Sequence, residues 1–211
     1  SAPIIALVAM VLIWGYSWVV MKIALAHAHP FDFAAIRVAI GCALLFAIVV
    51  LRGRSLALPG YRMAVILGLL QVALFVALAH FALLQAGPGK TSVLVFTMPF
   101  WMILFAHFLI HERMRGAQWI AVALAFAGLV AIVQPWNLES LSGSLLAVAA
   151  GAVWAICAVL NKKWPDAAAA DPLLFTAWQL FFGFLALAVL AFVHPHDPIR
   201  WNWEFGWTLA F

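Results

Sequence analysis

The stretch 63-MAVILGLLQVALFVALAHFALLQ-85 decides the fold class, because it carries no Asp, Glu, Lys or Arg. It is also longer than the ~20 apolar residues that a helix needs to cross the hydrocarbon core of a bilayer. Runs of similar character lie at 4–25, 31–51, 90–110, 117–134, 143–161 and 173–193, and a further run occupies 205–211. We therefore predict an all-α fold, a polytopic membrane helix bundle.

The composition supports a membrane protein. Hydrophobic residues make up 68% of the chain and charged residues 9%, whereas soluble domains have roughly 45–50% and about 25%. We therefore expect the protein to lie mainly within a lipid bilayer. The net charge of +4 does not indicate nucleic acid, because the basic residues stand in short clusters beside the apolar runs. Cys42 and Cys157 lie inside such runs, which favours two small buried side chains over a disulfide.

Basic residues predict the orientation of the bundle. Alternate loops hold most of them: Arg52, Arg54 and Arg62, then Arg113 and Arg115, then Lys162 and Lys163. The other loops hold Lys90 and Arg200. Because Lys and Arg collect on the cytoplasmic side, we expect a multi-pass protein of a bacterial-type inner membrane with its N-terminus in the cytoplasm.

The segment Gly89-Lys90-Thr91 resembles the end of a phosphate-binding P-loop. That motif also needs a glycine five residues before Gly89, where this chain has Leu84. We interpret Gly87-Pro88-Gly89 as a tight turn between two spans. No cofactor is predicted, and no obligate protein partner is inferred.

An internal repeat is visible in the sequence. The segment 14-WGYSWVVMK-22 matches 154-WAICAVLNK-162, and Pro30-x-x-Phe33-x-Ala35 matches Pro172-x-x-Phe175-x-Ala177, followed by Gly41 and Gly183. The repeat unit holds five spans, an odd number, so the second copy must enter the membrane from the opposite side. We predict a first five-helix unit at 1–136 and the start of a second, inverted unit at 143–211. Inverted repeats are typical of transporters, and a complete pair of units has about ten spans.

These residues resemble the drug/metabolite transporter superfamily, EamA type. The resemblance rests on 14-WGYSWVVMK-22, 30-PFDFAAIR-37, 91-TSVLVFTMPFW-101 and 111-HERM-114. It implies five-plus-five helices and alternating access, that is, a secondary transporter of a small-molecule substrate and not an enzyme. Within the family, 91-TSVLVFTMPFW-101 is most similar to exporters of amino acids, including aromatic ones. The alternatives are a channel-like facilitator for other small solutes, such as drugs or nucleobases, and a membrane-embedded lipid enzyme acting through His111-Glu112-Arg113.

Several side chains at membrane depth are candidate substrate-binding residues. Trp14, Trp101 and Trp154 either line an aromatic cavity or serve helix packing. His80 either binds a substrate carboxylate or a proton, or is a neutral core histidine. Pro99 interrupts its helix and, with Thr97, either lines the site or marks a packing kink. We expect His80 and Trp101 to face one shared cavity.

Charged residues near the outer ends of the first two spans are candidates for a gate. Lys22 and Arg37 either reach the interface or pair with Asp32; alternatively they form an outer gate or a positive site for a carboxylate. The histidines at positions 27, 29, 194 and 196 are all expected outside, where a zinc site is an alternative to chance; we predict no metal. No Asp or Glu lies at mid-depth in the complete spans, so coupling uses His80, uses helices beyond this sequence, or is absent.

Overall fold

The protein is an all-helical bundle in the part of the chain that the structure, a computed structural model, describes: residues 2–57, 60–112, 116–134, 141–165 and 171–210. Seven helical stretches there are long and apolar enough to cross a membrane. They are Ile4–Ala24, Pro30–Leu51, Tyr61–Ala86, Pro88–Ile110, Gly116–Val133, Leu141–Lys163 and Pro172–Val193. The predicted polytopic helix bundle is confirmed. Arg113, Arg115 and the predicted unit boundary at 136 lie outside the described residues.

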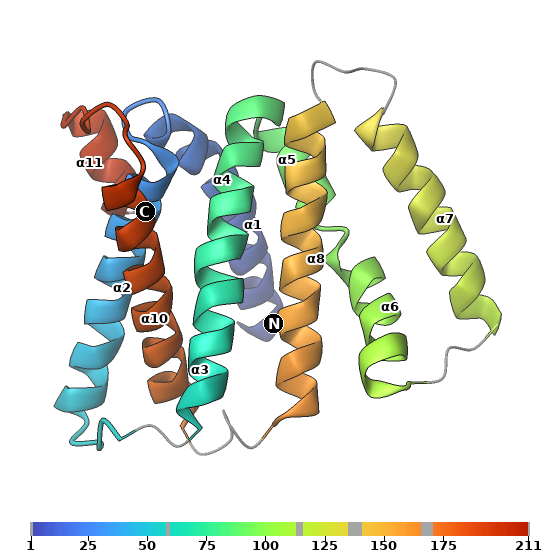
Figure 1. Cartoon of the computed structure of the whole chain (residues 1–211), viewed down its shortest axis with the longest axis horizontal. Coiled ribbons are helices and arrows are strands. Elements are labelled where there is room, and N and C mark those ends of the chain that lie inside the picture. Colours follow the sequence, from blue (N-terminus) through green and yellow to red (C-terminus); the bar gives the residue numbers. More distant parts are fainter. Residues whose placement is uncertain (1, 58–59, 113–115, 135–140, 166–170, 211) are drawn as a thin grey trace.

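The elements follow one another along the chain as Figure 1 labels them. They are α1 (Ala2–Ala24), α2 (Pro30–Leu51), α3 (Tyr61–Leu67), the π-helical segment η1 (Gly68–Leu74), α4 (Phe75–Ala86), α5 (Pro88–Val95), α6 (Met98–Ile110), α7 (Gly116–Val133), α8 (Leu141–Lys163), α10 (Pro172–Val193) and α11 (Trp203–Ala210). The third span therefore consists of α3, η1 and α4, and the fourth of α5 and α6.

Successive spans alternate in direction, so the bundle has two distinct ends (Figure 1). We call the end with the α4–α5 turn the Gly87 end, and the end with the α2–α3 connection the Arg54 end. Helices α1 and α8 run in opposite directions, as do α2 and α10. An inverted repeat requires these directions; the superposition of the two units stays a prediction.

Proline residues set the starts of two long helices. Pro30 begins α2 and Pro172 begins α10, at a position where the missing N–H is not needed. The residue before each proline caps the helix: Nδ1 of His29 accepts from the N–H of Phe31, and the carboxylate of Asp171 accepts from two N–H groups. The N–H of Leu174, together with Arg54 at 2.9 Å, lowers the pKa of Asp171.

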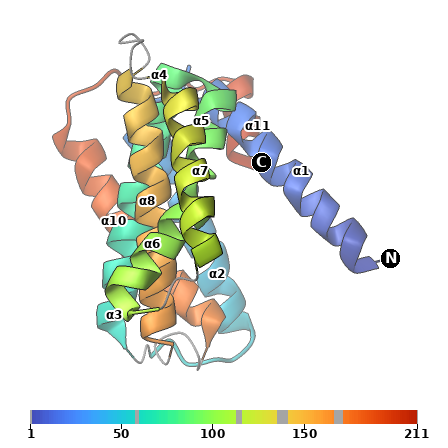
Figure 2. The ribbon, with the colours of Figure 1, turned by 90° about the vertical axis from the view of Figure 1, so that its right-hand side faces the viewer.

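Glycines allow α10 to approach the third span closely. A Cβ added at Gly68 would lie 2.7 Å from the carbonyl oxygen of Gln179, and one at Gly183 would lie 2.4 Å from Cβ of Val72. Small residues at helix contacts are typical of membrane bundles, where close packing holds helices together. Helix α1, by contrast, leans away from the bundle (Figure 2), and its side chains from Ile4 to Ile13 are exposed.

The fourth span is broken near its middle. Helix α5 ends at Val95 and α6 begins at Met98, and the Thr97 hydroxyl donates to the carbonyl oxygen of Leu94 at 2.6 Å. The sequence placed this interruption at Pro99; the break lies just before it, because proline fits the first turn of the following helix. Cys42 and Cys157 are buried free thiols, as predicted.

Candidate functional site

A cavity of about 250 Å³ lies between α1, α2, α4, α8 and the break in the fourth span. Its walls are mainly aromatic, and five rings line it: Trp14, Trp18, Phe75, Phe96 and Trp154. Three lining side chains are polar: Ser17, Arg37 and His80. Because α1 and α8 carry the matching halves of the sequence repeat, the cavity lies between helices of both predicted units.

Trp14 and Trp154, the matching tryptophans of the repeat, meet at this cavity. Their ring centroids are 6.3 Å apart, and Phe75 contacts Trp154 edge to face at 4.9 Å. Phe96 packs against Trp14 at 6.0 Å and against Trp18 at 6.4 Å. Edge-to-face contacts of this kind fix ring orientation, so the rings form an ordered wall that can stack on a planar or apolar molecule.

His80 is a buried polar member of the cavity wall, 2% exposed. Its Nδ1 lies 3.3 Å from the carbonyl oxygen of Pro30, which can only accept, so this nitrogen carries the proton. The ring also stacks on Phe33 with centroids 5.3 Å apart. When this ring is neutral it has a single N–H, and Nε2 of His80 is then an acceptor.

Arg37, on α2, is the charged member of the cavity wall. Its guanidinium carbon lies 5.9 Å from the ring centroid of Phe33, within the range of a cation–π contact. No carboxylate forms an ion pair with Arg37 among the residues that the structure describes. The sequence singled out Arg37 as a gate or carboxylate-binding candidate, and the structure places it beside His80 in the same cavity.

Trp101 is not among the residues that line the cavity containing His80, so the structure does not bring these two predicted site residues together there. Trp101 packs on the far side of the break, with Phe100 at 4.8 Å and Phe105 at 6.1 Å. The break ends the α5 helix before this residue, so the helical phase does not continue from Phe96 to Trp101. Phe96 takes the expected place in the wall.

Pro99 lines a different cavity, of about 320 Å³, toward the Arg54 end. Glu112 and Lys162 line the same cavity and form an ion pair that joins the ends of α6 and α8. Lys163 adds a contact to the carbonyl oxygen of Leu109 at 3.4 Å. Thr97 lines neither cavity, so the structure does not bring the predicted cluster of Thr97, Pro99 and Trp101 to the aromatic site.

Lys22 and Asp32 have partners other than those expected. The Lys22 ammonium donates to the carbonyl oxygens of Leu83 and Leu84 at 2.9 and 3.0 Å, which ties α1 to the last turn of α4. Asp32 contacts Nε2 of His196 at 2.6 Å, in the connection that follows α10. The structure thus pairs neither Lys22 nor Arg37 with Asp32, which was one of the alternatives that the sequence left open; the carboxylate contacts a residue distant in sequence instead.

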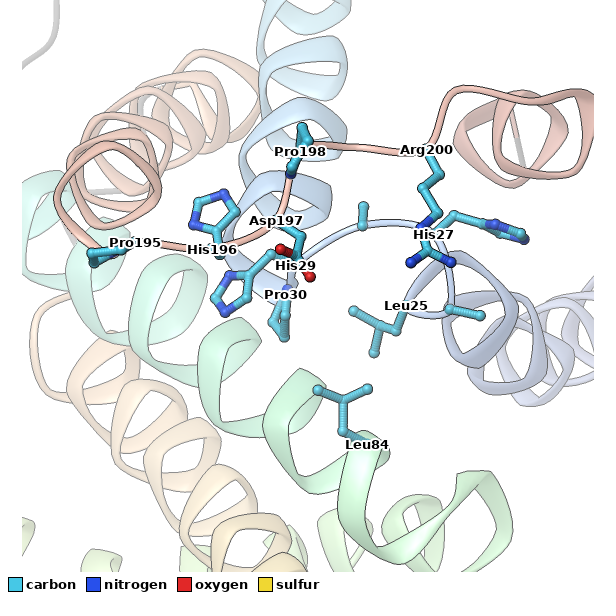
Figure 3. Close-up of a pocket in the computed structure, with 12 residues that line it drawn as sticks. Leu25, His27, His29, Pro30, Leu84, Pro195, His196, Asp197, Pro198 and Arg200 are labelled. Carbon is cyan, nitrogen blue, oxygen red and sulfur yellow. The ribbon is translucent and has the colours of Figure 1, made fainter.

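Histidines form a stack over the Gly87 end, beside a pocket of about 660 Å³ (Figure 3). The ring of His29 stacks on His196 at 4.4 Å and on His194 at 5.3 Å. Rings that stack face to face do not converge on one ion. Consistent with that geometry, the described ranges contain no group of three His, Cys, Asp or Glu placed to hold a metal.

The two stacked rings need opposite protonation states. His196 directs Nδ1 to the carbonyl oxygen of His194 at 2.5 Å and Nε2 to Asp32, so both nitrogens must donate and the ring is an imidazolium. These acceptors raise the pKa of His196. In His29, Nδ1 accepts the N–H that caps α2, so this ring is neutral. Burial and the adjacent charge of His196 lower the pKa of His29.

A second contact holds the same connection. The backbone N–H of Arg200 donates to the carbonyl oxygen of His27 at 2.8 Å, and the His27 ring contacts Glu204 at 3.1 Å. Figure 3 shows Arg200 beside His27 on one side of the pocket and His196 beside His29 on the other. The segment between α10 and α11 is thus fastened at two points over the α1–α2 turn.

Sequence reasoning missed several wall residues. Trp18 and Met21 follow Trp14 at helical spacing, and that periodicity could have assigned them to the same face of α1. Phe75 and Phe96 carried no such signal, because their placement depends on the π-helical segment and on the break in the fourth span.

The family of the chain follows from comparison with known proteins. Residues 1–134, which include most of the cavity wall, match the EamA-like transporter family. The chain belongs to this family. As an EamA-like protein it is a multi-pass membrane protein related to transporters of small solutes.

Several relatives are named as transporters. The chain is 28% identical to the uncharacterized transporter YoaV of Bacillus subtilis, over 98% of this chain and 73% of YoaV. It is 31% identical to the uncharacterized transporter YvbV of the same organism, over 96% and 67%. The uncharacterized inner membrane transporter YedA of Escherichia coli is 28% identical over 75% of this chain and 52% of YedA.

The fold is also found in a solved structure. A protein of known crystal structure superposes with a TM-score of 0.59 at 23% identity, covering 93% of this chain and 71% of the other. At that level of identity, the likeness concerns the fold alone.

Proposed function

We propose that this EamA-like protein is a secondary transporter that exports small metabolites across the inner membrane, amino acids with aromatic or bulky apolar side chains among them. The observation that carries the proposal is the aromatic cavity between α1, α4 and α8, with three polar side chains in its wall. Its volume of about 250 Å³ is below the roughly 300–1,000 Å³ of sites for drug-sized ligands. A substrate with a single ring suits that volume.

Alternating access needs a site that each end of the bundle can close in turn. The aromatic cavity lies between two sets of polar ties. At the Gly87 end, Lys22 joins α1 to α4 and His196 joins the α10–α11 segment to α2. At the Arg54 end, Lys162 joins α8 to α6. These contacts are few and polar, so they can break and re-form without disturbing the apolar core.

Aromatic walls also support the second candidate, a carrier of planar uncharged solutes such as nucleobases. Stacking on Trp14 and Trp154 serves either substrate, and the two candidates differ in what they require of the polar side of the cavity. A nucleobase would use Ser17 and His80 as hydrogen-bonding partners, whereas an amino acid brings a carboxylate.

Flux into proteoliposomes tests the proposal. The full-length protein is reconstituted, and the entry of radiolabelled phenylalanine, leucine and uracil is compared with entry into protein-free liposomes. We expect saturable phenylalanine flux with weaker leucine flux and no uracil flux. Uracil flux without amino-acid flux would support the second candidate, and the absence of protein-dependent flux for all three would refute the proposed substrates.

A further inference from the structure

Arg37 is a cation at membrane depth without a carboxylate partner in the described part of the chain. An unpaired charge within a membrane bundle is costly, and such residues are usually paired or face a water-filled pathway. The nearby Phe33 ring supplies a cation–π contact at 5.9 Å, which leaves the N–H groups of the guanidinium free to donate. A bound anion would satisfy them.

The other polar groups of the cavity do not duplicate this role. The proton of His80 is directed to the carbonyl oxygen of Pro30, so Nε2 accepts and would repel a carboxylate. The Ser17 hydroxyl donates to the carbonyl oxygen of Trp14 at 2.5 Å. Arg37 is thus the strong donor available to a negatively charged group.

A second donor without an acceptor lies in the same wall. Trp18 is 4% exposed and lines the cavity, and its indole Nε1 is buried with no hydrogen-bond partner among the described residues. A buried N–H without an acceptor costs free energy. Because this nitrogen is closed off from the cavity surface, a carboxylate in the cavity reaches the guanidinium of Arg37 and not the indole N–H.

The cavity does not offer the complement of an ammonium group. No Asp or Glu is among the described residues that line it. The charge of the wall is therefore positive, and its main recognition elements are one cation and five aromatic rings. A carboxylate and an aromatic ring on the substrate therefore both favour binding in this cavity. An amino group on the substrate meets no opposite charge there.

We propose that Arg37 binds the carboxylate of the substrate, and that the cavity accepts aromatic monocarboxylates whether or not they carry an amino group. This inference rests on the proposed transport function and narrows its substrate class. Arg37 then acts as a specificity-determining residue: it selects carboxylates over amines and over neutral planar solutes.

Competition against phenylalanine flux tests the inference. The competitors are 3-phenylpropionate, which lacks the ammonium group, and phenethylamine, which lacks the carboxylate. In the native protein we expect 3-phenylpropionate to inhibit at concentrations close to those of unlabelled phenylalanine, and phenethylamine to need about tenfold more or higher, because it loses a charge-assisted hydrogen bond.

Variants at Arg37 give the matched comparison. Arg37→Gln should raise the inhibitory concentration of 3-phenylpropionate about tenfold or more, and Arg37→Lys, which keeps the charge but not the bidentate geometry, should fall between. Arg62→Gln, at an exposed arginine beside the start of the third span, should change nothing. Size-exclusion profiles and incorporation into liposomes confirm that each variant is folded and inserted.

The outcomes separate the two levels of the proposal. If no phenylalanine flux is seen, the proposed function fails before Arg37 is tested. If phenylalanine is transported but phenethylamine competes as well as 3-phenylpropionate, or Arg37→Gln discriminates between them as the native protein does, the function stands and the role of Arg37 is refuted.

Discussion

Replacing Gly183 with alanine should destabilise the protein, although alanine is the better helix former. The new Cβ on α10 would lie 2.4 Å from Cβ and Cγ1 of Val72 and 2.9 Å from the carbonyl oxygen of Gly68. Carbon atoms pack at ~3.5–4.0 Å, so α10 and η1 would have to separate by about 1 Å. Overpacking costs ~1–3 kcal/mol, and an overlap with two carbon atoms of Val72 belongs at the upper end of that range, ~2–3 kcal/mol. Helix propensity returns ~1 kcal/mol, so the expected net loss is about 1–2 kcal/mol.

Thermal unfolding of the detergent-solubilised protein measures this effect. A net loss of that size lowers the Tm of a chain this long by roughly 2–8 °C. Glycine-to-alanine substitutions at two other positions serve as controls, because they add the same methyl group without a steric clash. A Cβ at Gly41 would lie 3.5 Å from Leu180, in ordinary contact, and one at Gly128 would meet nothing within 4 Å. Both should keep or raise the Tm. If Gly183→Ala unfolds at or above the native temperature, the close approach of α10 to η1 is refuted.

Two further predictions concern the ends of the bundle. The contact of the His196 imidazolium with Asp32 stabilises the fold, and this stabilisation is lost as the pH rises through the raised pKa of His196. The cap that His29 forms on α2 needs the neutral ring, so its stabilisation is lost as the pH falls through the lowered pKa of His29. Tm measured against pH should therefore have a maximum between the lowered pKa of His29 and the raised pKa of His196, which lie on either side of the ordinary value of about 6.5. Asp32→Asn should weaken the fall on the alkaline side, and the carbonyl oxygen of His194 should keep part of it. An unchanged alkaline limb would contradict the assignment. For orientation, cysteines at Ser55 and Gly89 are labelled with an impermeant maleimide in whole cells, against the two buried native thiols as background. We expect labelling at Gly89, and labelling at Ser55 alone would reverse the predicted topology.

The fold was largely predictable because membrane spans leave a one-dimensional signal. Length and hydropathy placed the seven spans within a few residues of their structural bounds. The repeat in the sequence singled out Trp14 and Trp154, and these rings do meet at 6.3 Å. His80 was found because an ionisable residue stands out in an apolar run.

What the sequence could not give depends on contacts between distant segments. Trp101 was assigned to the cavity because Pro99 weakens the helix at its level and loosened backbone is expected to face the bundle interior. In the structure the break lies just before Pro99, and Phe96 lines the cavity instead. The partner of Asp32 is His196, far along the chain in a loop, where no periodicity applies. The π-helical segment Gly68–Leu74 has no proline to mark it.

The central claim is that the aromatic cavity is the transport site, and two tryptophan variants test it most directly. Trp154 lines the cavity, whereas Trp119 lies on α7 and is 48% exposed outside it. Initial rates of phenylalanine counterflow are measured in proteoliposomes and normalised to the reconstituted protein. We predict that Trp154→Ala lowers the rate about tenfold, since it removes a stacking surface of the site, and that Trp119→Ala leaves it unchanged. A counterflow rate in Trp154→Ala equal to that of the native protein, or an equal loss of rate in both variants, would contradict the account.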